Sequence, residues 1–205
     1  MKSITPNSEI TAQARSALSG NWGRAIGVFC VWYLLAMGLG FSDSLLRILV
    51  FPPEVPVTIF SWIFSGPMTV GLAAFFICVI DDQARFSQMF YGFNCFGKSV
   101  GAYFMYNLFI LLWTLLLIIP GIIKSYSYAM TFYIIADDPE TGPIQAITRS
   151  RAMMAGNKWK YFRLQWRFFG WVLLCLLTLG IGFIWLGPYM STSMAAFYRD
   201  VEAGA

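Results

Sequence analysis

The sequence predicts an all-α membrane protein, a polytopic helical bundle, and its composition gives the first reason. Hydrophobic residues make up 58% of the 205-residue chain, whereas charged residues make up only 12%. A soluble domain typically carries about 25% charged residues. Several stretches of roughly 17–20 residues or more contain no charge, which is the length that a helix needs to cross the hydrocarbon core of a bilayer. We therefore expect a single membrane domain over residues 1–205.

The apolar runs predict six transmembrane helices that pair into three hairpins. The expected spans are residues 25–41, 58–80, 100–118, 120–136, 161–179 and 181–201. Gly-Pro or Pro-Gly pairs fall in the even-numbered spans, where proline kinks a helix and leaves a carbonyl without its usual donor. These kinks should face protein and not lipid. A connector with three prolines is expected over 42–57.

A short amphipathic helix is expected to precede each hairpin at the membrane interface. The stretches "ARSALSGNWGR", "ARFSQMFYGFNCFGK" and "SRAMMAGNKWK" share an order of residues, and Arg15–Gly20 and Arg151–Gly156 have the same spacing. We interpret the chain as three tandem units, 5–82, 83–138 and 139–201, packed about an axis along the membrane normal. The alternative is that glycine, aromatic and basic residues simply recur at membrane interfaces.

The basic residues predict the orientation of these spans. With six spans, both termini and the 2–3 and 4–5 loops share one side, and most of the 14 basic residues lie there. Only Arg47 and Lys124 do not. The excess of Lys and Arg in cytoplasmic loops places both termini in the cytoplasm.

Lys124 is the unusual residue of the fourth span, and two readings of it stay open. It can snorkel to the outer interface, or it can face inward and bind a lipid phosphate or a peptide carboxylate. Asp43 and Glu54 are its candidate partners within the chain. A small cavity between the hairpins would then be lined by Lys124, Tyr126, Tyr128 and Asn107.

A second group of candidates lies in the 4–5 loop and at the start of the fifth span. Basic residues alternate there with aromatic ones, a pattern that nucleic-acid binders also use. Beside an apolar span, anionic lipid headgroups on the cytoplasmic side are the better partner, and no nucleic acid is expected. The predicted headgroup contacts are Arg149, Arg151, Lys158, Lys160 and Arg163.

The residue inventory argues against an enzyme. The chain has no histidine, which excludes His-based triads and His metal sites. Its four cysteines are scattered and form no CxxC pair, so no metal site and no cofactor are expected. Asp81-Asp82 and Asp137-Asp138 are interpreted as helix ends and not as a paired-carboxylate site.

The stretches "IPGIIKSYSYAMTFYIIADDPE", "AITRSRAMMAGNKWKYF", "LTLGIGFIWLGPYM" and the amino-terminal "ARSALSGNWGRAI" resemble a bacterial family of integral membrane proteins, catalogued as a domain of unknown function. The resemblance implies several helices in the bacterial inner membrane and no established activity. The leading hypothesis is a non-enzymatic inner-membrane protein that binds or packs against lipids, membrane-protein partners or itself. The alternative is a small carrier or channel for an amphiphile or peptide.

Overall fold

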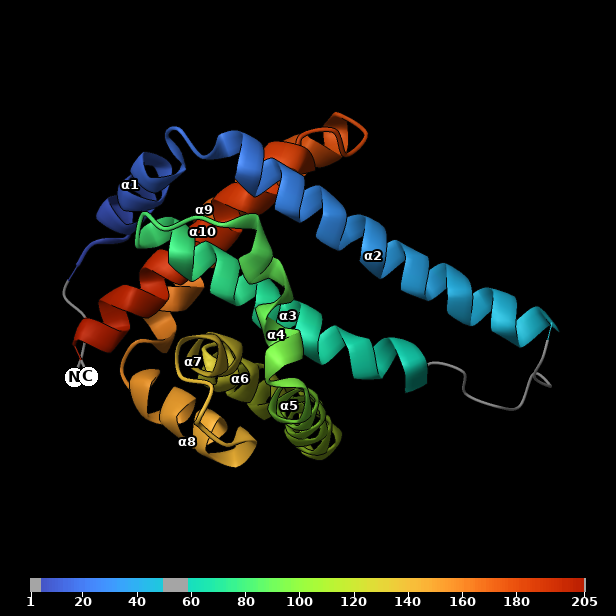
Figure 1. The fold of residues 1–205 in the computed structure, drawn as a ribbon. Helices are drawn as coiled ribbons and strands as arrows, with labels where there is room; N and C mark the ends of the chain where they lie inside the picture. Colours follow the sequence, from blue (N-terminus) through green and yellow to red (C-terminus); the bar gives the residue numbers. More distant parts are fainter. Residues whose placement is uncertain (1–4, 50–58, 205) are drawn as a thin grey trace.

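The computed structural model of the protein describes residues 5–49 and 59–204, and every regular element in this part of the chain is a helix. Figure 1 shows their arrangement. In chain order they are α1 (Asn7–Leu18), α2 (Trp22–Leu49), α3 (Ile59–Ile80), the 3-10 helix η1 (Phe86–Phe90), α4 (Tyr91–Asn94), α5 (Phe96–Leu116), α6 (Ile118–Tyr128), α7 (Thr131–Asp137), α8 (Pro143–Met153), α9 (Lys158–Leu177) and α10 (Phe183–Ala203). The all-α prediction is confirmed.

Three of these helices are long and apolar enough to cross a membrane, which indicates a membrane protein. They are Trp22–Phe41 within α2, Ser61–Ile80 within α3 and Phe96–Leu116 within α5. They correspond to the first three predicted spans. In Figure 1 the C-terminal half of α2 projects beyond the other helices, and Leu34, Met37 and Phe41 on it are exposed. Such a surface suits contact with lipid tails.

The second half of the chain is less simple than six continuous spans. The fourth predicted span is divided, because α6 ends at Tyr128 and α7 begins at Thr131. With its rise of about 1.5 Å per residue, α6 is only about 16 Å long. The first half of α9 carries four basic residues, and the end of α10 carries Arg199, Asp200 and Glu202. Six membrane crossings therefore stay a prediction.

The connector that the sequence predicts over 42–57 does not begin at residue 42 in the structure, because α2 continues as one helix to Leu49. Residues 50–57, which include Glu54 and the three prolines, lie outside the described residues, as does the side chain of Asp43. The pairing of Lys124 with either acid is therefore left as a prediction.

The short amphipathic helices pack on protein. Ile10, Ala14 and Leu18 form the expected apolar face of α1, and all three are fully buried. The helix α1 packs mainly on α10, η1 and α4 pack on α3, and α8 packs on α7 and α5. Each short helix thus contacts the second helix of a different predicted unit. The faces expected to rest on the membrane interface are covered by protein instead.

Two glycines allow the closest of these contacts, between α3 and the η1–α4 segment. A Cβ atom on Gly71 would overlap the carbonyl oxygen of Met89, and one on Gly92 would overlap that of Pro67. Pro67 is a proline inside α3. As expected from the sequence, this proline faces protein, because Pro67 is buried and α4 lies against its carbonyl oxygen.

Candidate functional site

Three basic residues from three helices line one cavity, which we call the cationic cleft. Lys124 of α6, Arg151 of α8 and Lys158 at the start of α9 surround about 420 Å³, together with Ser127, Thr148, Ala152 and Ala155. No carboxylate is among the described residues that line it. Like charges at close quarters repel one another, so a cleft with this lining favours an anion.

The break between α6 and α7 explains how Lys124 reaches Arg151 and Lys158. Ser150 of α8 is fully buried at the break. Its hydroxyl donates to the carbonyl oxygen of Ser127 at 2.9 Å and accepts from the amide of Met130 at 3.2 Å. A side chain inserted into a helix ladder is a recognised cause of a break. The same two bonds attach α8 beside α6, which brings Arg151 to Lys124.

Lys124 therefore lies with residues that the sequence assigned to the opposite side of the membrane. Its ammonium also lies 4.4 Å from the centre of the Trp113 ring. A cation over an indole face is attracted electrostatically, so Trp113 holds the lysine at the cleft without neutralising it.

The four predicted binding residues do not surround one cavity. Tyr126 lines a separate polar cavity of about 240 Å³, with Ser125 on one side and Tyr106, Tyr161 and Gln165 on the others. Tyr128 is buried against Tyr106 and Phe109. Asn107 donates its amide to the carbonyl oxygen of Tyr103 at 2.7 Å, within α5.

The five predicted headgroup contacts also divide into groups. Arg151 and Lys158 line the cationic cleft, and Arg163 is exposed. Lys160 points inward: its ammonium pairs with Asp200 at 2.5 Å, and only 8% of its side chain is exposed. Because the side chain of Lys160 points from α9 towards Asp200 of α10, it is not available to bind a lipid headgroup.

Arg149 is exposed but paired with acids of the chain. Its guanidinium lies 3.8 Å from Asp138 and 3.5 Å from Glu202. A hydrogen bond from the Thr141 hydroxyl lowers the pKa of Asp138, which keeps this carboxylate charged beside Arg149. Arg149 thus joins helix ends together and is less available to lipid than Arg163.

An ion network that the sequence did not predict links the ends of α3, α7 and α10. Arg199 contacts Asp81 at 2.5 Å, Asp137 at 3.0 Å and Glu202 at 2.8 Å. The hydroxyl of Tyr198 lies 3.2 Å from Asp137 and 3.1 Å from Glu202. The sequence contained a signal for this network. Asp81 and Asp137 lie at the ends of the second and fourth predicted spans, and Arg199 lies near the end of the sixth, so the predicted layout puts all three on the same side of the membrane. The network is structural in character, since Arg199 of α10 holds Asp81 at the end of α3 and Asp137 at the end of α7.

Comparison with known proteins adds one finding. Neither a curated protein nor a solved structure matches the chain. A family model does match residues 115–205, which include all three basic residues of the cationic cleft. The amino-terminal motif lies outside that match, so its part of the resemblance stays a prediction. Over residues 115–205 the resemblance is confirmed: this part of the chain matches the family described as protein of unknown function (DUF975).

Proposed function

We propose that the protein is an integral membrane protein without catalytic chemistry that binds anionic lipid through the lipid phosphate in the cationic cleft. The observation that carries the proposal is the convergence of Lys124, Arg151 and Lys158 on one cavity whose described lining residues include no acid. Phosphate oxygens accept charge-assisted hydrogen bonds from both lysine and arginine. The hydroxyls of Ser127 and Thr148 add polar atoms at the cavity wall.

The exposed face of α9 supports a position at the headgroup level. Trp159, Phe162, Trp166 and Phe169 stack in succession along it, with ring centres 5.0–5.8 Å apart. Trp159 and Trp166 are largely exposed. Exposed tryptophans concentrate where the bilayer meets water, and Arg163 on the same helix is then placed for a headgroup.

We further propose a bacterial inner-membrane location, several crossings and cytoplasmic termini. The support is the sidedness of the basic residues. The position of Lys124 strengthens it, because this apparent exception lies beside Arg151 and Lys158 of the side proposed to be cytoplasmic. The contacts of each short helix with another unit support the proposed threefold repeat in the same way.

The test is retention of anionic lipid by the purified protein in nanodiscs that contain phosphatidylcholine and a small fraction of phosphatidylglycerol, measured by native mass spectrometry. Lys124→Gln, Arg151→Gln and Lys158→Gln should each weaken retention by about tenfold, since a hydrogen bond to a charged group contributes about 1.5 kcal/mol. Arg85→Gln is the matched control, because it removes an exposed cation that lies outside the cleft and away from the exposed face of α9. An equal loss in the control would mean diffuse attraction, and no loss in any variant would reject the site.

A carrier for a small amphiphile is the second candidate, and the polar cavity around Tyr126 favours it. This cavity is lined by tyrosine, serine and glutamine side chains, among them Ser125, the residue after Lys124 in α6. A lipid phosphate held at Lys124 would have polar groups next to it along the helix. Transport predicts that the protein speeds lipid movement between the leaflets of a vesicle, whereas binding alone predicts no acceleration.

A further inference from the structure

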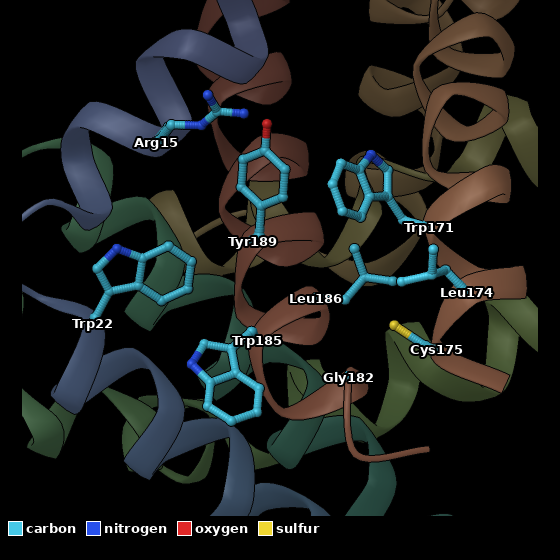
Figure 2. Close-up of a pocket in the computed structure, with 9 residues that line it drawn as sticks. All are labelled: Arg15, Trp22, Trp171, Leu174, Cys175, Gly182, Trp185, Leu186 and Tyr189. Carbon is cyan, nitrogen blue, oxygen red and sulfur yellow. The ribbon is translucent and has the colours of Figure 1, made fainter. Parts of the chain in front are cut away.

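Another cavity lies between a different set of helices and has a different character. It opens between α1, the start of α2, α9 and α10, and encloses about 460 Å³. We call it the tryptophan pocket, after Trp22, Trp171 and Trp185, which line it with Arg15, Leu186 and Tyr189. Figure 2 shows Arg15 and Tyr189 at one end, Trp22 and Trp171 on opposite sides and Trp185 towards the other end. None of these residues lines the cationic cleft.

Two walls of this pocket are indole rings that the described chain leaves partly uncovered. Trp171 is 57% exposed and Trp185 is 54% exposed. Leucine and cysteine side chains fill the space between the indoles in Figure 2. A concave surface of this kind is typical of sites for apolar ligands.

Charge is confined to one end of the pocket. The guanidinium of Arg15 lies 5.7 Å from the centre of the Tyr189 ring. The Tyr189 hydroxyl donates to the carbonyl oxygen of Thr11 at 3.4 Å, which ties the ring to α1 below Arg15. No carboxylate lines this pocket among the described residues. The pocket therefore has one cationic end and a long apolar remainder.

We propose that the tryptophan pocket binds a fatty acid, with its carboxylate at Arg15 and its chain among Trp171, Trp185 and Leu186. A single guanidinium matches a single carboxylate in charge and in its two-pronged geometry. The cationic cleft, with three charges, suits a phosphate instead. One undivided apolar cavity accommodates one acyl chain. The proposal uses residues separate from those of the proposed function, so either can fail without the other.

The experiment is photo-crosslinking with palmitic acid that carries a diazirine in mid-chain, added to the purified protein in nanodiscs of phosphatidylcholine. Labelled peptides are mapped by mass spectrometry. Labelling should saturate, concentrate in residues 171–189 and be displaced by unlabelled palmitate. Hexadecanol, which has the same chain and no charge, should compete about tenfold less well because the charge-assisted bond to Arg15 is missing.

Two variants and two matched controls test the two ends separately. Arg15→Gln should weaken competition by palmitate about tenfold without changing competition by hexadecanol. Leu174→Trp adds bulk to the pocket wall and should reduce labelling by the diazirine probe. Arg167→Gln removes an exposed arginine of α9 outside the pocket, and Leu177→Trp alters an 85% exposed leucine of α9 outside it. Both controls should label as the unaltered protein does.

Several outcomes would overturn the proposal. Labelling that does not saturate and spreads over the exposed leucines of α9 would show ordinary contact with bulk lipid. Equal competition by palmitate and hexadecanol would remove the role of Arg15. Competition by phosphatidylglycerol as strong as that by palmitate would assign the pocket to a phospholipid. Because Leu174→Trp acts on the chain and not on the charge, misfolding of the Arg15 variant would leave the pocket testable.

Discussion

The cationic cleft and the tryptophan pocket occupy matching positions in the chain but differ in chemistry. Arg15 and Trp22 are seven positions apart, as are Arg151 and Lys158. Tyr189 precedes the pair Phe197-Tyr198 by eight positions, and Lys124 precedes Phe132-Tyr133 by eight. Each cavity is thus lined by a short helix, the start of the next helix and the second helix of another predicted unit, and the tryptophan pocket is lined by α9 as well. The same framework presents three cations in one place and one cation among indoles in the other.

A third position of the same kind is closed. Pro67 precedes Phe75-Phe76 by eight positions, and the carbonyl oxygen of Pro67 lies directly against Gly92. The glycine brings α4 so near to α3 that no space is left for a side chain. Comparison of the three positions indicates that side-chain size, rather than backbone plan, decides which interface between the predicted units holds a cavity.

The largest expected effect comes from opening the closed position. Gly92→Ala places a methyl group where the carbonyl oxygen of Pro67 lies, and the backbone must move apart. Overpacking of this kind should lower the free energy of unfolding by about 3 kcal/mol or more, the upper end of its usual cost, because the atom that the methyl group meets is backbone. Thermal unfolding in detergent would detect this loss.

The control for this change is Gly170→Ala, in the middle of α9. A Cβ atom there meets nothing within 4 Å, and alanine favours a helix over glycine by about 0.5–1 kcal/mol. The control should therefore be as stable as the unaltered protein or more so. Equal stability of Gly92→Ala and the unaltered protein would show that α4 and α3 are not packed as described.

A comparably large effect separates the two lysines at the start of α9. Lys160→Met leaves Asp200 in the interior without this partner and should cost about 3 kcal/mol of stability, while retained anionic lipid per folded molecule stays unchanged. Lys158→Met should do the reverse, because Lys158 is only half-buried and lines the cleft. Unfolding midpoints and native mass spectra of both variants give the comparison. If Lys160→Met loses anionic lipid and Lys158→Met does not, Lys160 binds the lipid and Lys158 does not, which contradicts the roles assigned to the two lysines.

A smaller effect is expected where α8 is attached to α6. Ser150→Ala removes the bonds to the Ser127 carbonyl and the Met130 amide, and unpaired buried groups cost about 1–3 kcal/mol. Retention of anionic lipid should also fall, since Arg151 loses its attachment beside Lys124. Ser16→Ala, at an exposed serine that bonds only within α1, should change stability by less than about 0.5 kcal/mol. If Ser150→Ala retains as much anionic lipid as the unaltered protein, the hydrogen bonds of Ser150 at the break between α6 and α7 do not hold Arg151 beside Lys124.

Much of the fold could be read from the sequence because hydrophobic runs and glycine-proline signals are local. The buried face of α1 and the first three apolar spans follow from spacing alone. The burial of Lys160 had a local signal that was not used, since Lys160, Leu164 and Phe168 are four apart and all face inward. The position of Lys124 beside Arg151 and Lys158 had no such signal in the sequence. It depends on the hydrogen bonds that Ser150 makes at the break between α6 and α7, to residues 20 and 23 positions earlier. Hydrophobic periodicity does not reveal such bonds.

The most direct test of the central claim is an electron cryomicroscopy map of the protein in nanodiscs rich in phosphatidylglycerol. The account predicts phosphate density in the cationic cleft, within hydrogen-bonding distance of at least two of Lys124, Arg151 and Lys158. The same density should be missing from a map of Arg151→Gln. A cleft that is empty while phosphatidylglycerol headgroups are ordered elsewhere on the surface would contradict the proposed function.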